Sequence, residues 1–288
     1  MADRALVLGG GGITGIAWEL GILAGLAEAG VNLRIADLVV GTSAGSVVGA
    51  QFTSGADLDE LYARQLAPPG TERPARMRTR ALLRWGWAIA GSRHPQQARA
   101  RIGRMALTTG TGPCAATVAA QRRQVIGSRL QAHTWPERPL LVTAVDAESG
   151  EFAAFGRDSR VGEHSVTLVD AVAASCAVPG VWPPITIGGR HWIDGGVRSA
   201  TNADLAAGHD RVVVLAPITR GIGPSSGAAA RVAALGERAR VALVAPDPAA
   251  RGAIGRNVLD PARRAAAARA GRAQAAAIVD EVARIWSN

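Results

Sequence analysis

The stretch LVVGTSAGSVVGAQF (residues 38–52) joins a short apolar run to a helix-forming segment through a serine framed by glycines. The apolar run predicts a strand, ADLVVG (36–41), and a helix is expected to start at once in the residues that follow. Gly41-Thr42-Ser43-Ala44-Gly45 matches G-x-S-x-G at this junction, where a nucleophile on a sharp turn requires small neighbours. Ser43 is therefore the candidate nucleophile. The alternative is a turn rich in glycine and serine that has no chemical role.

A second glycine cluster lies upstream in LVLGGGGITG (6–15), between an expected strand at 5–8 and an expected helix at 13–29. Gly10, Gly12 and Gly15 fit G-x-G-x-x-G, the phosphate-binding turn of a dinucleotide fold. Such a fold also needs an acidic residue at the end of the second strand, where it holds the ribose hydroxyls. The nearest acid, Asp37, lies at the start of that strand, which is the wrong end for this role. A dinucleotide-binding module therefore remains an alternative, although the sequence lacks the acidic residue that such a fold needs at the end of the second strand.

Short apolar runs alternate with Ala-rich helical stretches along the chain, which is typical of an α/β fold with a mainly parallel central sheet flanked by helices. The length of 288 residues is enough for one large domain or two small ones, and we interpret residues 1–288 as a single domain. Further helices are expected at about 57–66, at 168–177 and at about 261–286. Further strands are expected in RPLLVTAVDAESGEFAAFG (138–156), ITIG (185–188), RHWIDGG (190–196), RVVVLAPI (211–218) and RVALVAPD (240–247).

Residues 68 to about 138 differ from the rest of the chain, because no strand-forming run interrupts them. APPGTERPARMRTR (67–80) is rich in Pro and Arg and is expected to be a loop. ALLRWGWAIAG (81–91) and CAATVAAQRRQVIGSRLQ (114–131) are expected to form helices. We interpret this segment as a helical, Arg-rich cap insertion above the sheet.

The formal net charge of +9 is unevenly distributed. All 32 basic residues are arginine, which GC-rich coding explains more simply than adaptation to nucleic acid. Nine arginines and one glutamate lie between positions 72 and 104, so this segment holds nearly the whole excess. A nucleic-acid-binding surface would be expected to spread its charge more widely, and no nucleic-acid partner is expected.

Trp85 and Trp87 lie within the Arg-rich segment 72–104. Tryptophan favours membrane interfaces and arginine favours anionic headgroups, so one interpretation is peripheral contact with an anionic membrane. The alternative is a solvated helix with both tryptophans packed on the sheet.

Cysteine usage and hydropathy narrow the class of protein. Cys114 and Cys176 are the two cysteines, and they offer neither a disulfide framework nor a metal-ligand spacing, so no metal and no cofactor are expected. The first residues run into a strand without a leader pattern, and no apolar run approaches the ~18 residues of a membrane span. These features predict a cytoplasmic protein, with peripheral membrane contact left open.

A serine nucleophile needs a base and a site for the oxyanion. The ordinary α/β-hydrolase uses a late histidine, but that fold has several strands before its elbow and only one fits before Gly41. His191 and His209 are the late histidines, and both are better explained as surface or packed side chains. Asp194, in HWIDGGV between a short strand and two glycines, is the better candidate. Its alternative is a simple Asp-Gly hairpin turn.

Three glycine-framed elements therefore follow one another: GGGGITG (9–15), GTSAG (41–45) and DGG (194–196). This set resembles the patatin-like phospholipase family, which carries G-G-G-x-[RK]-G on the first strand–helix turn, G-x-S-x-G on the next and D-G-[GA] far downstream. AASCAVPGVWPP (173–184) also resembles the Ala-rich helix and Pro loop of that family, and the resemblance covers about residues 4–220. The matching residues are Gly10-Gly11-Gly12-Ile13-Thr14-Gly15, Gly41 to Gly45, and Asp194-Gly195-Gly196.

The resemblance implies a three-layer α/β/α fold and a serine acyl hydrolase that acts on lipid or other carboxylic esters. It implies that Ser43 attacks the acyl carbonyl and that Asp194 takes its proton, with no histidine and no cofactor. The oxyanion would be held by the backbone N–H groups of Gly11, Gly12 and Ala44. Thr14 stands in place of the basic residue of the family motif, which weakens the case for a phospholipid substrate. A relative that holds lipid without cleaving it is the remaining alternative.

Overall fold

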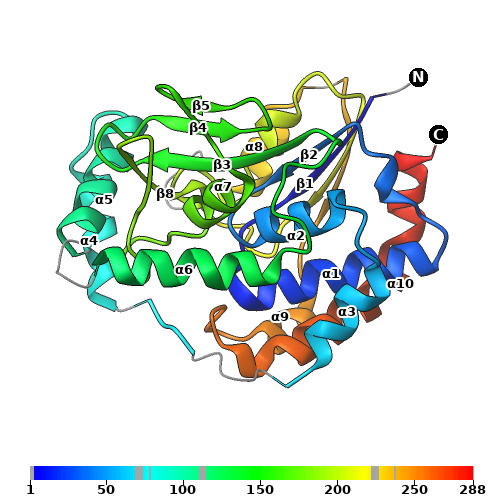
Figure 1. The fold of residues 1–288 in the computed structure, drawn as a ribbon. Helices are drawn as coiled ribbons and strands as arrows, with labels where there is room; N and C mark the ends of the chain where they lie inside the picture. The colour runs from blue at the N-terminus through cyan, green and yellow to red at the C-terminus, as the bar shows by residue number, and fades with distance from the viewer. Residues whose placement is uncertain are drawn as a thin grey trace.

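The computed structural model describes residues 3–68, 74–77, 79–109, 115–221, 227–236 and 238–287. At its centre lies a sheet with the strand order β10-β9-β1-β2-β3-β8-β7, and β4 pairs with β3 beside that path (Figure 1). The first five strands in this order pair in parallel, whereas β4, β7 and β8 pair antiparallel. The prediction of a mainly parallel central sheet is therefore confirmed. The strands are β1 (Arg4–Leu8), β2 (Leu38–Gly41), β3 (Leu140–Asp146), β4 (Phe152–Phe155), β7 (Ile185–Ile187), β8 (Arg190–Asp194), β9 (Arg211–Leu215) and β10 (Arg240–Val244).

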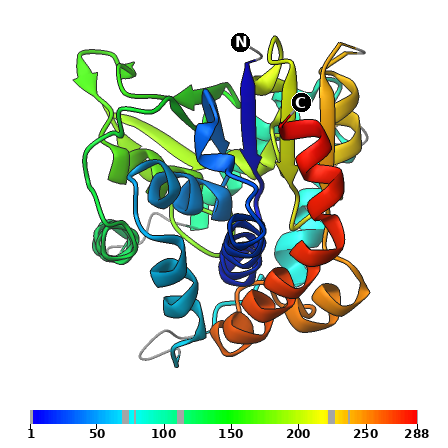
Figure 2. The same ribbon diagram turned by 90° about the vertical axis from the view of Figure 1, so that its right-hand side faces the viewer.

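Helices cover both faces of the sheet, because successive side chains of a strand point to opposite sides. On β1, Leu6 and Leu8 belong to one apolar core, and Ala5 and Val7 belong to another. The first core is shared by α1 (Gly12–Glu28), α2 (Ala44–Thr53), α7 (Leu168–Ser175) and α10 (Arg264–Trp286), and the second by η3 (Ala203–Ala206) and α8 (Ala228–Ala233). Figure 2 shows α10, in red, running beside α1, in dark blue.

The placement of β2 and β8 on β3 positions the site. Gly41, the last residue of β2, pairs with Val142, and Asp194, the last residue of β8, pairs with Ala144. Since β4 pairs with both of these β3 residues, it occupies the opposite edge, and β2 and β8 share one edge of β3. β2 runs parallel and β8 antiparallel to β3, so the two strands meet head-on. The residues that follow Gly41 are thereby brought to the end of β8.

The described residues of segment 68–138, which was interpreted as a cap insertion, form three helices and no strand: α4 (Thr79–Ala90), α5 (Pro95–Thr109) and α6 (Ala115–Arg129). α4 and α5 pack directly on the sheet, where Trp85 and Ile102 share an apolar core with Val145 and Ile193. α6 packs on α7 at the other face, and its Ile126 joins the first core. The segment therefore flanks both faces of the sheet. The sequence predicted two of these helices and missed α5.

The two tryptophans of α4 have different environments. Trp85 is 6% exposed and packs on the sheet, whereas Trp87 is 79% exposed. The alternative in which both tryptophans pack on the sheet is therefore wrong for Trp87. Residues 72, 73 and 78 of the Arg-rich segment lie outside the described residues.

The remaining elements follow local signals. α3 (Leu58–Leu66), which the sequence predicted, begins after Asp57, whose carboxylate accepts the Glu60 N–H at 3.0 Å and so caps the helix. α9 (Pro248–Ile254) starts in the same way after Asp247. The strands β5 (Arg160–Val161) and β6 (His164–Ser165) form a small hairpin that the sequence did not predict. Along the described chain, no helix has the length and apolar character needed to cross a bilayer.

Candidate active site

Ser43 lies on a strained turn between β2 and α2. Its backbone has φ 51° and ψ −112°, a positive-φ conformation that costs a non-glycine residue about 1–3 kcal/mol. The Ser43 N–H donates to Ser175 Oγ at 2.9 Å, and its carbonyl accepts from Ser46 Oγ at 2.6 Å and from Cys176 Sγ at 3.3 Å. These contacts hold the turn in the sharp geometry that a nucleophile elbow needs.

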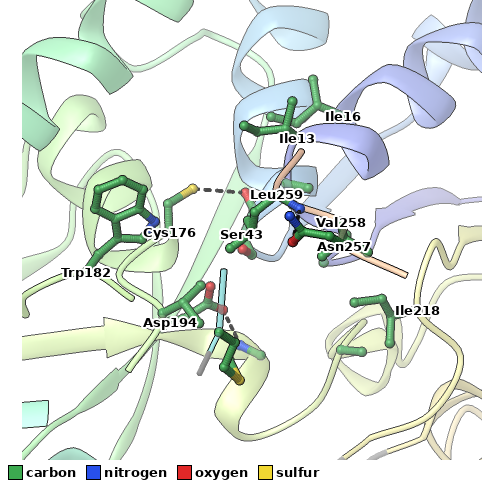
Figure 3. A pocket seen from close by; sticks show the side chains of 18 of the residues that line it. Ile13, Ile16, Ser43, Cys176, Trp182, Asp194, Ile218, Asn257, Val258 and Leu259 are labelled. Atoms are coloured by element: carbon green, nitrogen blue, oxygen red, sulfur yellow. Dashed lines mark hydrogen bonds between the residues drawn. The ribbon is translucent and has the colours of Figure 1, made fainter. Parts of the chain in front are cut away.

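Asp194 ends β8 and faces the same space as Ser43 (Figure 3). The residue is 5% exposed, and its Oδ1 accepts the Gly196 N–H at 2.7 Å. Burial raises the pKa of the carboxyl to about 6, while hydrogen bonding by Ser43 and Gly196 and the charge of Arg122 pull the pKa the other way. Asp194 is therefore mostly ionised at neutral pH, yet it is a stronger base than an exposed aspartate.

Three backbone N–H groups border this space. In the part of the chain that the structure describes, the N–H groups of Gly11, Gly12 and Ala44 have no hydrogen-bond partner, and all three residues line one cavity with Ser43. The neighbouring N–H of Gly10, in contrast, donates to the Ala200 carbonyl at 2.7 Å. Backbone N–H groups without a partner beside a serine hydroxyl could stabilise an oxyanion.

Glycine is required at two positions of these turns. Gly12 has φ 60°, and a Cβ there would lie 2.6 Å from the Val258 carbonyl oxygen. At Gly45, a Cβ would overlap the carbonyl oxygen of Leu8, because the start of α2 lies against β1. The two turns can therefore pack closely on neighbouring backbone.

Ser43, Asp194 and the three N–H groups open into a cavity of about 730 Å³, a volume typical of small-molecule sites. Figure 3 shows Ser43 and Asp194 between Trp182 and Cys176 on one side and a set of aliphatic side chains on the other. The aliphatic side chains are Ile13, Ile16, Ile218, Val258 and Leu259, and the arginines at the cavity are Arg76, Arg122, Arg129, Arg220 and Arg256.

Comparison with known proteins identifies the family. The family model described as patatin-like phospholipase matches residues 6–207. The chain belongs to the patatin-like phospholipase family. This is a family of carboxylic ester hydrolases, and the resemblance seen in the three glycine-framed motifs is confirmed.

Individual relatives match over shorter stretches or at low identity. The proteins named lysophospholipase NTE1 from Aspergillus oryzae and Phaeosphaeria nodorum are 46% and 48% identical over 59 residues, which are 20% of this chain and 4% of each relative. The chain therefore spans only a small part of the length of these curated relatives. The crystal structure of VipD from Legionella pneumophila aligns with 98% of this chain and 67% of its own, at 15% identity and a TM-score of 0.46.

In this patatin-like phospholipase, Thr14 faces away from the cavity. Its side chain is fully buried, and the Val258 carbonyl accepts both the Thr14 N–H at 3.1 Å and its Oγ1–H at 3.3 Å. Thr14 is not among the residues that line the cavity. Position 14 therefore anchors the first glycine turn, and the positive charge at the cavity comes from other elements.

A buried polar network ties the two strand ends together beneath the site. Asn202 Nδ2 donates to Thr42 Oγ1 at 3.0 Å and to the Gly195 carbonyl at 3.3 Å, and Thr143 Oγ1 donates to Thr42 Oγ1 at 3.0 Å. The side chains of Thr42, Thr143 and Asn202 are completely buried. Thr42 precedes Ser43 and Gly195 follows Asp194, so this network fixes the two candidate residues relative to each other. Sequence reasoning missed it, because Thr143 and Asn202 belong to no motif.

The other polar candidates do not compete for the site. None of the five histidines, all of which the structure describes, lines the cavity. Asp37 lies at the start of β2, away from the glycine turns, and accepts the Arg4 N–H at 2.8 Å. Among the described residues, no group of three acidic, histidine or cysteine side chains could hold a metal ion.

Cys176 lines the cavity next to Ser43, but its thiol is not a competing nucleophile. Burial raises the pKa of this thiol to about 11, so it stays protonated at neutral pH. As a thiol it donates to the Ser43 carbonyl and supports the turn. Cys114 lies outside the described residues.

Proposed function

We propose that this chain hydrolyses lipid esters, with Ser43 as the nucleophile and Asp194 as the general base. The observation that supports the proposal is the head-on meeting of β2 and β8, which brings these two side chains to one cavity beside the N–H groups of Gly11, Gly12 and Ala44. A buried base, a strained serine and bare N–H groups are the three parts that acyl transfer requires.

The reaction proceeds in two halves. In the first, Ser43 Oγ attacks the acyl carbon while Asp194 takes the hydroxyl proton, and the N–H groups hold the tetrahedral oxyanion. The intermediate collapses as the C–O bond to the alcohol breaks, and the alcohol leaves with the proton from Asp194. In the second half, water attacks the acyl-serine, Asp194 takes the proton of that water, and collapse releases the fatty acid. The proton returns to Ser43 Oγ.

The test is labelling with a fluorophosphonate probe, followed by mapping of the modified residue and turnover of a short-chain p-nitrophenyl ester. We expect an adduct on Ser43, and a loss of turnover of at least about 10³-fold in Ser43→Ala and in Asp194→Asn. Ser128→Ala, an exposed serine on α6, is the control and keeps both labelling and turnover. An adduct on another residue, or a Ser43→Ala variant that keeps its turnover, contradicts the proposal.

The two alternatives from the sequence give different results in the same assays. A relative that only holds lipid would bind a fatty acyl ligand without labelling or turnover. A dinucleotide-binding module would show saturable binding of a dinucleotide, which a lipid hydrolase does not.

We further propose that α4 and α5 contact an anionic membrane. Trp87 is 79% and Leu83 is 63% exposed on α4. A shallow groove beside Trp87 is lined by Arg84 of α4 and by Arg101 and Arg104 of α5. Exposed apolar side chains among arginines suit a lipid surface with anionic headgroups. Trp85 of the same helix lines the cavity that holds Ser43, so a lipid bound at α4 would lie next to the site.

A further inference from the structure

One wall of the cavity carries positive charge from α6. Arg122 and Arg129 both line the cavity, and their spacing of seven residues places them on one face of the helix, two turns apart. Burial raises the pKa values of Asp194 and Cys176, and the charge of Arg122 opposes this rise at both groups. Arg129 acts in the same direction on Cys176. Both guanidinium groups are therefore close enough to act on the groups around Ser43.

Contacts with neighbouring residues hold the Arg122 side chain and the Arg129 backbone in place. The Arg122 Cζ lies 4.3 Å from the centre of the Trp182 ring, which is a cation–π contact with another residue of the same cavity. The backbone of Arg129 is tied to α2, because its carbonyl accepts the Gln51 Nε2–H at 2.7 Å. A guanidinium that is already positioned loses little conformational freedom when it binds an anion.

Positive charge also surrounds the cavity at its rim. Arg76, Arg220 and Arg256 are exposed and line it from three other segments. Among the described residues that line the cavity, Asp194 is the single acidic side chain. The field at the site therefore favours an anionic ligand.

The opposite wall is apolar. Ile13, Ile16 and Leu259 lie across Ser43 and Asp194 from Trp182, on which Arg122 stacks (Figure 3). Ser43 thus lies at the boundary between an aliphatic wall and an arginine wall. A ligand that fills both sides has an apolar chain and an anionic group, with its ester between them.

We propose that Arg122 and Arg129 bind an oxyanion on the alcohol side of the substrate, so that the enzyme selects acyl esters of anionic alcohols over neutral esters. This inference rests on the proposed function and specifies its substrate class. The acyl chain lies along the aliphatic wall, and the headgroup anion lies on α6. Phosphate and carboxylate both offer paired oxygens to a guanidinium, so the site accepts either chemistry.

The test compares three esters that share one acyl chain: a lysophosphatidic acid, a monoacylglycerol hemisuccinate and the plain monoacylglycerol, each below its critical micelle concentration. We expect a higher kcat/KM for the two anionic esters than for the neutral one. A preference for the phosphate ester alone would identify phosphate, and an equal preference for both anions would identify a general oxyanion site. An absence of preference for either anion contradicts the inference.

The arginine variants locate the site. Arg122→Gln and Arg129→Gln should each lower the anionic-to-neutral ratio of kcat/KM roughly ten- to a hundredfold, because each removes a charged hydrogen-bond donor. Arg269→Gln removes the same charge from an exposed position of α10 outside the cavity and should leave the ratio unchanged. An equal loss on neutral and anionic esters, with a shifted pH midpoint, would mean that Arg122 acts only through Asp194, and it would overturn the inference.

Binding separates this inference from the proposed function. Lysophosphatidic acid is titrated into Ser43→Ala and into the Ser43→Ala/Arg122→Gln double variant, and heat is recorded. Binding that is at least roughly tenfold weaker in the double variant supports the anion site even if no ester is turned over. Equal binding by the two variants overturns the anion site. Hydrolysis of neutral esters would still support the proposed function in that case.

Discussion

Asp194 meets two opposed requirements. As the proposed base, its carboxyl has to be buried to act on Ser43 away from bulk water, but burial favours its neutral form. The Gly196 N–H, the Ser43 side chain and the charge of Arg122 favour the ionised form, and the outcome is a pKa of about 6. A base with a pKa just below the working pH is ionised and still basic enough to accept a proton.

This balance predicts the pH dependence of the reaction. We expect kcat/KM for a neutral short-chain ester to rise with pH through a midpoint of about 6, because only ionised Asp194 can accept the Ser43 proton. The measurement is a rate profile from acidic to mildly alkaline pH. A midpoint at about 4, the value of an exposed aspartate, would mean that the acting base is solvated.

The same pKa shift links Asp194 to stability, and this provides a control. The folded-state pKa of about 6 lies above the unfolded value, so between about pH 4 and 6 the folded chain keeps a proton that the unfolded chain has lost. The free energy of unfolding therefore decreases as pH rises through that window. Asp194→Asn removes this decrease, and above pH 7 we expect the inactive variant to be more stable by on the order of 1–3 kcal/mol. Chemical denaturation at pH 4.5 and 7.5 measures the difference.

Single residues differ in how far the sequence could identify them. Ser43 and Asp194 could be proposed because each lies in a local glycine-framed pattern. Thr143 and Asn202 carry no such pattern. Thr143 lies on β3 between the residues that pair with Gly41 and Asp194, and Asn202 reaches it from the segment before η3. The sequence does not distinguish Arg122 from the other arginines, because only the packing of α6 shows that it lines the cavity.

At the scale of whole elements, α1 and α10 approach each other closely through small residues. A Cβ at Gly21 of α1 would overlap the Ala268 carbonyl oxygen, and a Cβ at Gly271 of α10 would overlap the Trp18 carbonyl oxygen. Trp18 Nε1 donates to the buried Gln274 Oε1 at 3.0 Å across the same interface. The backbone of each helix therefore lies in the groove of the other, with no room for a methyl group.

This packing predicts a large effect of a small substitution. Gly21→Ala should lower the free energy of unfolding by about 1–3 kcal/mol or more, since the helices must move apart. The matched control is Gly86→Ala on α4, where a Cβ would meet nothing within 4 Å. There the higher helix propensity of alanine should raise stability by roughly 0.5–1 kcal/mol. Equal effects of the two substitutions in thermal denaturation would contradict the close packing.

The helices and strands also differ in whether their sequence patterns predicted them. The buried strands and the helices α3 and α7 were predicted from their residue patterns, whereas α8 and α9 were not. α5 was missed because Pro95–Thr109 is polar on average, rich in Gln and Arg, and carries a glycine in its middle. That glycine, Gly103, lies where a Cβ would overlap the Ala147 carbonyl oxygen, so it marks a close approach to the end of β3 and not a break in the helix.

At the scale of the whole molecule, the site depends on segments beyond the family match. The match ends at residue 207, yet β9 pairs with β1 and α10 packs along α1. Val258 accepts the Thr14 N–H, and Val258 and Leu259 both line the cavity. The C-terminal stretch, which the motifs did not cover, therefore supports the first glycine turn and completes the aliphatic wall.

Arginine-bearing helices lie at two opposite ends of the molecule. α4 and α5 present Arg84, Arg101, Arg104 and the exposed Trp87 at one end of the sheet, whereas α10 lies at the other end (Figure 1). If α4 and α5 form the membrane-contacting face, removing an arginine from α4 should weaken vesicle binding more than removing one from α10. If only the net charge of the protein mattered, the two substitutions would weaken vesicle binding equally.

Flotation with vesicles separates these two cases. We expect the protein to float with vesicles that contain phosphatidylglycerol and to stay behind with pure phosphatidylcholine at physiological salt. Arg84→Gln should lower the partition roughly fivefold, since one arginine near an anionic surface contributes about 1 kcal/mol, and Trp87→Ala should lower it further. Arg269→Gln on α10 should have little effect. An equal loss for Arg269→Gln would show general charge attraction, and a failure to float with either vesicle would remove the membrane contact altogether.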